Sequence, residues 1–480
     1  MRTAYSVETV RAAERELMAR VPEGALMQRA AAGLAVVCAE VLGKVYGSRV
    51  VLLVGSGDNG GDALYAGARL ARRGAGLSAV LLSPERVHAG GLAAFRGAGG
   101  RVAARDGAED VLRGADLVVD GIVGIGGKGA LRDRASQLAG AVRVLGKPVV
   151  AVDLPSGVDA DSGVVVGEAV RADVTVTFGA YKPGLLIDPG REYAGVVRLV
   201  DIGLGLGLGE GGGEVEALQY VDVASLLPMP TGESDKYRRG VVGIVAGSER
   251  YPGAAVLAVA GALRGGAGAV RYVGHAADAV IARFPETLVS AGPPSKAGRV
   301  QAWVVGPGIG DDSERLADVV GADVPVLIDA DGLRLADAAA VRGRGASTLL
   351  TPHAGEAAAL LGVAREEVER GRLAAVRELA GLYGATVLLK GSTTLVAGPA
   401  GGAVRVNPTG TPWLATAGSG DVLSGLAGAL LAAGLGAGDA GAVGAYLHGL
   451  AGRRAADGAP VGAQDVAEAI PVAWRDVRGD

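Results

Sequence analysis

The strongest candidate for a catalytic group is a carboxylate at the start of a glycine-rich helix near the C-terminus. In the stretch NPTGTPWLATAGSGDVLSGLAGALLAAGL (407–435), Gly418, Ser419 and Gly420 immediately precede Asp421. Such small residues leave backbone N–H groups bare at a helix start, where the helix dipole favours an anion. A carboxylate in that first turn can accept the proton of an attacking hydroxyl beside a transferring phosphoryl group. The plainer alternative is that Asp421 only caps its helix.

A second polar turn in the same half, LLKGSTT (388–394), ends an apolar run with Lys390, Gly391 and hydroxyl residues. These groups suit the phosphates or the ribose of a nucleotide, although an ordinary hairpin turn has a similar composition. His353 follows another apolar run in LLTPHAGE, with Glu356 close by. A single histidine in such a place is often structural, so this position is a weaker candidate for ligand binding.

Two further loops of the second half also follow apolar runs. GPGIG (306–310) contains Gly308, and GSERYPGAAVLA (247–258) places Ala255 at the start of a helix. Each could be a tight turn. The four loops follow strands of one predicted parallel sheet, so they share one edge and favour a large phosphorylated ligand.

In the first half, GSGDNGGDALYAGARLA (55–71) fits the dinucleotide-binding fingerprint G-x-G-x-x-G and follows the apolar run RVVLLV. However, Asp58 and Asp62 stand among its glycines, and carboxylates repel phosphate. Something besides phosphate must therefore share this site. The alternative is that Asn59 and Asp62 only close the loop or cap the helix.

Oxygen-bearing side chains end three predicted strands of the first half. Asn59 follows the first, Asp120 ends LVVD, and Asp153 and Ser156 lie in AVDLPSG. The carboxyl ends of parallel strands share one edge, so these groups can converge. Amide, carboxylate and hydroxyl oxygens suit an alkali or alkaline-earth cation rather than zinc. By itself, Asp120 could also be a turn residue.

A second glycine loop, GIVGIGGKGA (121–130), could cradle phosphates beside Lys128. It is not a Walker A loop, because Gly129 follows Lys128 where that motif needs Ser or Thr. A hydride-transferring dehydrogenase is disfavoured, because the second strand ends AVLLSPE with Ser83 and only a displaced Glu85 where an acidic residue should bind the ribose.

Composition restricts the class of protein further. The chain of 480 residues exceeds one core and predicts two or more domains. Its 47 Lys and Arg residues against 51 Asp and Glu residues disfavour nucleic acid as a partner. The one cysteine, Cys38, excludes an internal disulfide and a thiolate cluster. The charged start and the absence of an uninterrupted 18-residue apolar span predict a soluble, cytoplasmic protein without a membrane partner.

Alternation of Val/Ile/Leu runs with Ala-rich helical patterns predicts an α/β protein with parallel sheets wrapped by helices. The glycine-dense stretch 204–223 indicates a linker, with a domain boundary near 205–220. No repeat of 20–50 residues is evident, which disfavours a solenoid. The predicted strands are 49–55, 77–82, 101–104, 117–120, 149–153, 174–178, 197–201, 240–246, 269–273, 302–305, 325–329, 347–350 and 385–397.

These motifs together resemble a known family. GSGDNGGD, VVDGIVGIG, VDLPSG and FGAYKPG resemble the NAD(P)H-hydrate epimerase domain, whereas TPHAGE, LLKGSTT and AGSGDVLSG resemble the ribokinase-like NAD(P)H-hydrate dehydratase domain. Their order on one chain is similar to that of the fused bacterial NAD(P)H-hydrate repair enzymes and covers almost the whole sequence. The resemblance implies a Rossmann-like doubly wound epimerase domain over 1–209 and a ribokinase-like α/β/α dehydratase domain over 220–480.

The resemblance also implies the reactions. The substrates would be NADHX and NADPHX, the hydrated forms of the reduced nicotinamide cofactors, with an R or S hydroxyl. The first domain would interconvert the epimers. The second would dehydrate the S form with ADP as co-substrate, giving AMP, phosphate and NAD(P)H, with Asp421 removing the hydroxyl proton and magnesium bridging the nucleotide phosphates. Asp153 is the predicted acid/base of the epimerase, with Lys182 as second choice.

Site residues follow from the same resemblance. The potassium ligands would be Asn59, Asp120 and Ser156. The residues expected to bind the hydrated cofactor are Asp58, Asn59, Gly60, Gly61, Asp62, Gly124, Ile125, Gly126, Gly127, Lys128, Gly129, Ala130, Asp153, Ala255, Gly308, His353 and Asp421. The residues expected to bind the nucleotide are Lys390, Gly391, Ser392, Thr393, Thr394 and Gly420. We also expect a homo-oligomer.

This chain departs from the family pattern NNGGDG at two positions, where it has Asp58 and Ala63. Asp58 puts a charge in place of a neutral substrate contact, whereas Ala63 adds only a methyl group. Two alternatives remain open on the sequence. The second half could be a kinase of a sugar or vitamin alcohol that releases a stable phosphoester, or the first half could be a non-catalytic pyridine-nucleotide sensor.

Overall fold

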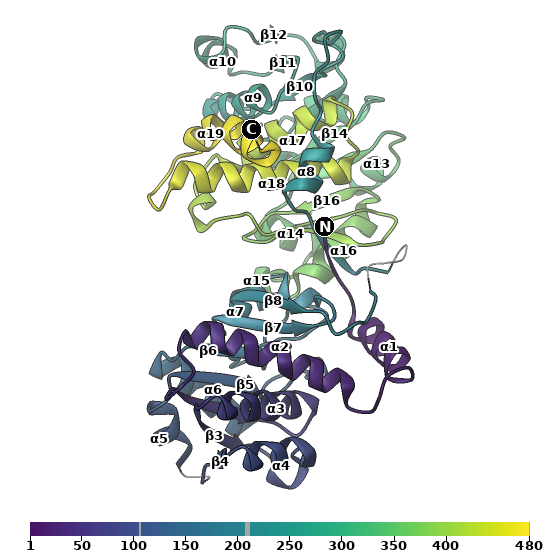
Figure 1. Cartoon of the computed structure of the whole chain (residues 1–480). Coiled ribbons are helices and arrows are strands. Elements are labelled where there is room, and N and C mark those ends of the chain that lie inside the picture. Colours follow the sequence, from purple (N-terminus) through teal and green to yellow (C-terminus); the bar gives the residue numbers. More distant parts are fainter. Residues whose placement is uncertain (105–106, 207–211, 480) are drawn as a thin grey trace. The chain divides into compact units, whose positions relative to one another are not determined.

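The structure, a computed structural model, describes residues 1–104, 107–206 and 212–479. It divides into two compact units, Thr3–Glu214 and Val215–Asp480, and the first two residues belong to the second unit (Figure 1). Residues 207–211 of the predicted linker, and with them the predicted end of the first domain at 209, lie outside the described residues. Each unit is described by itself.

The smaller unit contains a seven-stranded, all-parallel sheet in the order β4-β3-β2-β5-β6-β7-β8. The order reverses at β2, which is the point where a doubly wound sheet opens a crevice for ligands. The strands are β2 (Arg49–Val54), β3 (Gly76–Leu81), β4 (Arg101–Val102), β5 (Leu117–Gly121), β6 (Val149–Val152), β7 (Val174–Phe178) and β8 (Val196–Val200). The helices are α1 (Val7–Met18), α2 (Ala25–Leu42), α3 (Asp58–Arg72), α4 (Ala89–Gly97), α5 (Ala108–Arg113), α6 (Asp133–Leu145) and α7 (Gly190–Ala194).

Helices cover both faces of this sheet. Along β2, Val50 and Leu52 pack on the side of α2 and α3, whereas Val51 and Leu53 pack with α5 and α6. Successive side chains of a strand point to opposite faces, so a strand buried on both sides must be apolar throughout. The run RVVLLV is therefore typical of a central strand. The predicted doubly wound α/β class is confirmed for this unit.

The helix α2 is long and apolar enough, by length and composition, to cross a membrane. In the structure it packs against α3, and its Leu34 and Cys38 are fully buried in the core beside the sheet (Figure 1). A core helix of a globular unit passes the same composition test. We interpret α2 as such a core helix.

The larger unit contains an eleven-stranded mixed sheet in the order β1-β9-β18-β17-β16-β15-β14-β13-β10-β11-β12. From β12 to β16 all neighbours are parallel, whereas β17 is antiparallel to both of its neighbours. The strands are β1 (Arg2–Ala4), β9 (Val215–Ala217), β10 (Val241–Val245), β11 (Ala269–Val273), β12 (Leu288–Ser290), β13 (Ala302–Val305), β14 (Val326–Ile328), β15 (Thr348–Leu350), β16 (Thr386–Leu389), β17 (Thr394–Ala397) and β18 (Val404–Asn407).

The helices of the larger unit place its catalytic candidate at the carboxyl edge of the parallel strands. The central helix α17 packs against α9 and α18 and against β13 and β10, so Asp421 in its first turn is held by a rigid, buried element. The helices are α8 (Tyr220–Leu226), α9 (Pro252–Arg264), α10 (Ala277–Arg283), α11 (Ser313–Val320), α12 (Asp331–Leu335), α13 (Ala338–Arg342), α14 (Ala354–Leu361), α15 (Arg365–Arg370), α16 (Arg372–Tyr383), α17 (Ser419–Ala432), α18 (Ala437–Ala456) and α19 (Ala463–Arg478).

Two sequence-based assignments of secondary structure are corrected by the structure. The predicted linker 204–223 contains β9, which pairs with β18, and the beginning of α8. The predicted single strand 385–397 is a hairpin, in which β16 and β17 flank the turn at residues 390–393. A three-residue strand such as β9 leaves no measurable periodicity, and its partner is nearly 190 residues away, so only tertiary pairing reveals it.

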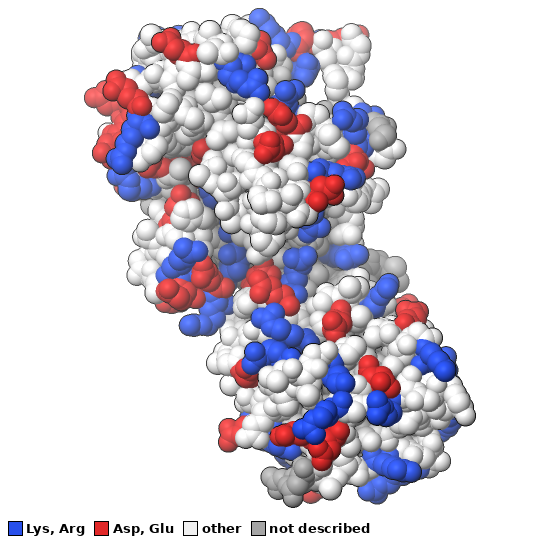
Figure 2. Space-filling view, turned by 90° about the vertical axis from the view of Figure 1, so that its left-hand side faces the viewer, with Lys and Arg blue, Asp and Glu red and all other residues white. Residues whose placement is uncertain are grey.

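Charges on the surface agree with the near balance of the composition. On the face shown in Figure 2, acidic and basic side chains alternate over both units without a broad patch of one sign. Nucleic acid binding depends on a clustered basic surface, which this face does not present.

Candidate active sites

In the smaller unit, the three predicted oxygen ligands lie together at the carboxyl edge of the sheet. Ser156 Oγ donates to Asp120 Oδ1 over 2.7 Å, and Ser156 N donates to Asp120 Oδ2 over 2.8 Å. The backbone N–H of Val123 donates to Ser156 Oγ over 3.0 Å. Asp120 is fully buried, and burial raises its pKa to about 6 although the hydrogen bonds from Ser156 and Ile122 oppose the shift.

Asn59 in α3 contacts Gly124, the residue after Val123, whose backbone N–H donates to Ser156. Its Nδ2 donates to the carbonyl of Val152 over 2.5 Å, and its Oδ1 lies against Gly124, where a Cβ atom would collide with it. Gly124 is therefore glycine for a steric reason, because the amide of Asn59 occupies the space of a side chain. Gly60 is constrained in the same way by the carbonyl of Gly55.

Asp153 follows β6 with a φ of +67°, a left-handed conformation that few non-glycine residues adopt. Its Oδ1 accepts from Lys182 Nζ over 2.5 Å and from Thr177 Oγ1 over 3.1 Å, and both charged side chains are almost completely buried. Lys182 Nζ also donates to Thr177 Oγ1 and to the carbonyl of Phe178. Strained backbone and a buried ion pair at a strand end are typical of functional sites.

A basic cavity of about 640 Å³ lies on one side of the first glycine loop, which contributes Gly55 and Ser56 to its lining. The predicted second glycine loop contributes its residues 126–130, including Lys128. Four cationic side chains line this cavity against a single carboxylate, that of Asp159: Arg86, Lys128, Arg132 and Arg134. Glycine backbone and guanidinium groups together suit the phosphates of a dinucleotide.

An acidic cavity of about 370 Å³ is lined by the other end of the same loop, through Asp58 and Asp62. Asp58 starts α3, where a carboxylate also benefits from the helix dipole. The two carboxylates therefore face a cavity different from the one with the cationic lining. This arrangement separates the two carboxylates from the cationic side chains and so removes the conflict between carboxylates and phosphate that the sequence presents.

The helix α1 forms a further wall of this site, which sequence reasoning missed. The backbone N–H of Val7 donates to Asp161 Oδ1 over 2.7 Å, and that of Tyr5 donates to the carbonyl of Tyr181 over 2.9 Å. Arg11 approaches Gly126 of the second glycine loop, and Glu14 lines the acidic cavity. The helix resembles an ordinary amphipathic surface helix in sequence, so nothing in its pattern signals these two residues.

In the larger unit, a network of buried polar groups joins β14, the β16–β17 turn and α17. Lys390 Nζ donates to Asp329 Oδ1 over 2.7 Å, and Ser424 Oγ donates to Asp329 Oδ2 over 2.6 Å. Glu356 Oε2 lies 3.7 Å from Lys390 Nζ. Burial lowers the pKa of Lys390, but the carboxylates of Asp329 and Glu356 outweigh it and raise the pKa above its usual value.

Asp421 stands at the edge of this network, in the first turn of α17. Burial raises its pKa to about 7, and repulsion from Asp329 adds to the shift while Lys390 opposes it. Gly418 begins the turn with a φ of +87°, which favours glycine, and a side chain at Gly420 would approach Lys390 Nζ. The predicted residues Asp421, Gly420 and Lys390 therefore meet in space, and a carboxylate with such a pKa is poised to accept a proton.

The other predicted nucleotide-binding residues form the turn between β16 and β17. Buried Arg372 donates from Nη2 to the carbonyls of Lys390 and Thr393, over 3.0 and 3.1 Å, and a Cβ atom at Gly391 would collide with its guanidinium. Thr393 is fully buried, whereas Ser392 is exposed. Thr394 Oγ1 donates back to the carbonyl of Gly391. The turn is thus fixed from behind by Arg372, which sequence reasoning missed.

Three candidates of the second half have structural roles in the fold. His353 caps α14, where its Nδ1 accepts from the backbone N–H of Glu356 over 3.1 Å, and its side chain is largely exposed. Ala255 is fully buried in α9 beside Gly247. Gly308 has a φ of +64° and lies against Ala254 of α9.

Asp329 and His448 are two further residues of the site that the sequence patterns did not single out. Asp329 follows β14 in VLIDADG, the same placement that singled out Asp120 and Asp153, and the next residue, Ala330, has a strained φ of +49°. A rule that treats every acidic residue at a strand end alike would have found it. His448 of α18 is hydrogen-bonded to the backbone of Ser419. Burial lowers the pKa of His448 to about 4 although this hydrogen bond opposes the shift, so His448 holds the AGSGD turn as a neutral group.

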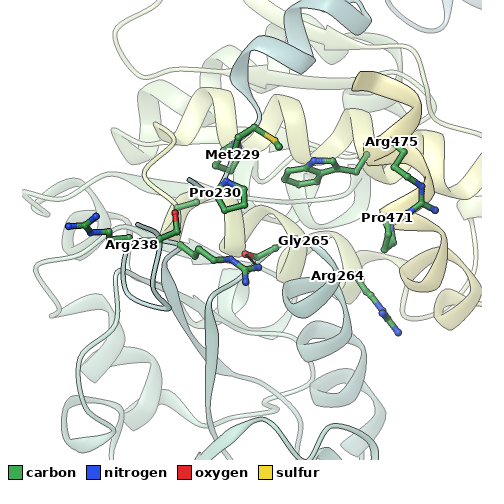
Figure 3. A pocket seen from close by; sticks show the side chains of 13 residues that line it. Met229, Pro230, Arg238, Arg264, Gly265, Pro471 and Arg475 are labelled. Atoms are coloured by element: carbon green, nitrogen blue, oxygen red, sulfur yellow. Dashed lines mark hydrogen bonds between the residues drawn. The ribbon is translucent and has the colours of Figure 1, made fainter. Parts of the chain in front are cut away.

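A separate cavity of about 340 Å³ in the larger unit lies away from these residues (Figure 3). It is lined at the C-terminal ends of α9 and α17, by Arg264 and Ala433, and by Pro471 and Arg475 of α19. Asp421 stands at the other end of α17, which is about 20 Å long at 1.5 Å per residue. This cavity is therefore not the site of the Asp421 chemistry.

Comparison with known proteins places both halves in families. The family described as NAD(P)H-hydrate dehydratase matches residues 242–472, and the family described as YjeF-related protein N-terminus matches residues 23–184. The first match contains Asp329, Lys390 and Asp421, and the second contains Asn59 and Asp153.

Relatives match the chain over nearly its full length. The bifunctional NAD(P)H-hydrate repair enzymes Nnr of Mycobacterium tuberculosis and Mycobacterium leprae are 51% and 50% identical to it, over 92% and 93% of both chains. Among solved structures, the ADP/ATP-dependent NAD(P)H-hydrate dehydratase of Bacillus subtilis, co-crystallised with ATP and Mg²⁺, is 28% identical with a TM-score of 0.51. That alignment covers 55% of this chain and 99% of the Bacillus chain.

Proposed function

The chain belongs to the family of bifunctional NAD(P)H-hydrate repair enzymes, and on this premise we propose which of its residues carry out the two reactions. The enzyme epimerises R- and S-NAD(P)HX and dehydrates the S form to NAD(P)H, with ADP as the co-substrate. The proposal assigns the epimerase to residues 1–209 and the dehydratase to residues 220–480. The observation that carries it is the meeting of Asp421, Lys390 and Asp329 beside the glycine turn of α17.

In the dehydratase site, Asp421 removes the proton of the ring hydroxyl while the terminal phosphoryl group of the nucleotide transfers to the oxygen. Hydroxide is a poor leaving group and phosphate a good one, so the phosphorylated ring then loses phosphate and a ring proton, giving NAD(P)H. The N–H groups of the turn at Gly420 stabilise the phosphoryl oxygens. The nucleotide is held by Lys390, Gly391, Ser392, Thr393 and Thr394. Magnesium, when bound with the nucleotide, would neutralise further charge on its phosphates. The remaining cofactor contacts of the half are Ala255, Gly308 and His353.

The pH dependence of dehydration tests the role of Asp421 as a base. Its pKa of about 7 in the protein without ligands means that the reactive carboxylate form increases as the pH rises through 7. We therefore expect kcat/KM for S-NADHX at saturating ADP to rise by about tenfold per pH unit below 7 and to level off above it. A flat profile between pH 5.5 and 8.5, with the protein folded throughout, would exclude a base with this pKa.

In the epimerase site, the basic cavity holds the phosphates of the hydrated cofactor through Gly124, Ile125, Gly126, Gly127, Lys128, Gly129 and Ala130. The first glycine loop borders the basic cavity through Gly55 and Ser56 and the acidic cavity through Asp58 and Asp62. In this proposal the nicotinamide end is directed toward Asp153 by the residues Asp58, Asn59, Gly60, Gly61 and Asp62. The cationic lining of one cavity and the carboxylates of the other support this orientation, because each end of the substrate meets groups of suitable charge.

Potassium fits the cluster of Asn59, Asp120 and Ser156. The buried carboxylate of Asp120 accepts only neutral donors in the hydrogen bonds described above, and a buried charge is costly unless a counter-charge accompanies it. Amide, carboxylate and hydroxyl oxygens are hard ligands that suit such a cation. When bound, potassium would supply the positive charge that this pocket lacks.

Exchange of the cation tests this proposal. We expect replacement of potassium by tetramethylammonium to slow epimerisation at least tenfold and to leave the dehydration of S-NADHX unchanged, because the cluster lies in the smaller unit. Asn59→Ala should weaken the potassium dependence, while Asn407→Ala, an asparagine of the larger unit, serves as the matched control. Equal epimerisation rates in both cations would contradict a potassium site.

Two further expectations belong to the proposal. The expected cytoplasmic location agrees with a substrate that is a damaged intracellular cofactor. The expected homo-oligomer is tested by light scattering of the purified full chain, which gives its mass in solution directly.

A further inference from the structure

The acidic cavity of the smaller unit contains more negative charge than phosphate binding explains. Glu14 of α1 and Asp58 and Asp62 of α3 line it together. Asp62 is 7% exposed, and its Oδ1 has no hydrogen-bond partner among the described residues. A buried carboxylate oxygen without a hydrogen-bond partner destabilises the fold, so we expect this oxygen to contact a ligand.

The same cavity has an apolar wall that suits a flat ring. Met18, Leu26, Met27, Phe178 and Ile202 line it beside the carboxylates. Its volume of about 370 Å³ falls within the roughly 300–1,000 Å³ typical of small-molecule sites. In the part of the chain that the structure describes, no three His, Cys, Asp or Glu side chains gather to hold a metal ion. The apolar wall beside the acidic side chains suits an organic ligand with an apolar ring that carries positive charge.

Glu14 differs from the two residues predicted as acid/base groups. Asp153 and Lys182 are bound to each other in a buried ion pair, whereas Glu14 appears in no hydrogen bond or ion pair of the described residues and lies on the cavity wall. Burial and the nearby carboxylates of Asp153 and Asp58 raise the pKa of Glu14, whereas Lys182 and Arg11 lower it. The net shift of the pKa is upward. Asp62 and Glu23 are the other charged groups of the cavity. An upward shift of the pKa favours the protonated form of Glu14, the form that can donate a proton.

We infer that Glu14 is the proton donor of the epimerase and that the acidic cavity stabilises a cationic form of the nicotinamide ring. This inference rests on the proposed epimerase function and assigns its chemistry. Glu14 donates its proton to the C6 hydroxyl, the C–O bond breaks, and water leaves. The nitrogen lone pair forms a C=N bond, so the ring carries one positive charge. Water then adds to the opposite face of C6 and returns one proton to Glu14, which inverts the centre without a change in oxidation state.

The cavity has the charge that this step requires. Burial and the neighbouring carboxylates of Asp153 and Asp58 raise the pKa of Asp62, which favours its neutral form. The ring is neutral before the hydroxyl leaves and cationic afterwards, so the carboxylate of Asp58 favours the intermediate over the substrate. Asp58 replaces the neutral asparagine that the family pattern has at this position. In this assignment its charge faces the ring and not the phosphates.

The test uses the full chain and pure R-NADHX without ADP, so that dehydration is silent, and follows the epimers by chromatography. Glu14→Gln should slow epimerisation by about 10²-fold or more and abolish the loss of rate at high pH, because the donor no longer titrates. Glu14→Asp, which keeps the acid, should retain part of the rate. Glu16→Gln is the matched control, because this glutamate of the same helix is exposed and paired with Arg20.

Isotope incorporation tests the route independently of the rate. In ¹⁸O-labelled water, each inversion should place one solvent oxygen at C6, measured by mass spectrometry at low conversion. Full activity of Glu14→Gln, or inversion that retains the original oxygen, would overturn the inference. Dehydration of S-NADHX with ADP should be the same in all variants, which shows that the chain is intact. If the unmodified protein does not interconvert the epimers at all, the epimerase function itself fails, and the result is distinct from failure of Glu14.

Discussion

Substitution of Asp421 by Asn is expected to lower kcat for the ADP-dependent dehydration of S-NADHX by about 10²–10⁴-fold, because the amide cannot accept the hydroxyl proton. The change is nearly isosteric and removes a carboxylate that burial and Asp329 disfavour, so the larger unit should remain folded. Binding of ADP should persist, since Lys390 and the backbone of the turn are unchanged. The measurement is a single-turnover absorbance trace at the reduced nicotinamide band.

The control for this variant is Asp439→Asn, which changes a partly exposed carboxylate of α18 and should leave the rate within about twofold. Epimerisation should be normal in both proteins. If D421N kept more than a tenth of the rate at saturating ADP, the proton acceptor would be another group, and the assignment of Asp421 would fail.

The second large effect is expected at Lys182. Lys182→Met leaves the carboxylate of Asp153 buried without its partner, and removal of one partner of a buried ion pair costs about 3–5 kcal/mol. The transition of the smaller unit should therefore shift to lower urea concentration, and epimerisation should be lost. All three tryptophans, at 303, 413 and 474, lie in the larger unit, so their fluorescence transition should not move.

The double variant Asp153→Asn/Lys182→Met separates stability from chemistry. It removes the uncompensated charge and keeps a residue that tolerates the left-handed backbone of position 153. We expect circular dichroism to show most of the lost stability restored, while epimerisation stays absent. Recovery of epimerisation in this variant would mean that neither Asp153 nor Lys182 contacts the reacting ring.

Most of the fold follows from the sequence because its signals are local. RVVLLV, followed by a glycine loop and a helical pattern, specifies a buried strand and the turn after it. Each predicted strand overlaps a strand of the structure, and the predicted strand 385–397 overlaps two. The residues at those strand ends, such as Asn59 and Asp120, then converge because parallel strands share one carboxyl edge. The sequence did not predict four strands of only three or four residues, β1, β9, β12 and β18, because such short strands depend on partners elsewhere in the chain.

The site residues that could not be predicted from the sequence are positioned by tertiary contacts. Arg372 fixes the turn at Gly391 from a helix, and His448 holds Ser419 from another helix, so neither carries a motif. Glu14 lies on the wall of the acidic cavity because a hydrogen bond to Asp161 holds the start of α1 in place. Asp329 is different, since its place at a strand end was visible in VLIDADG.

The most direct test of the central claim, that one chain carries both activities, is the return of reduced cofactor from a mixture of R- and S-NADHX with ADP and magnesium. We expect the intact chain to return NADH from the whole mixture, because the R form is first converted to the S form. Recovery that stops at the S fraction, after correction for slow spontaneous epimerisation, would contradict an active epimerase in the first half. No recovery with ADP or ATP would contradict the repair function as a whole.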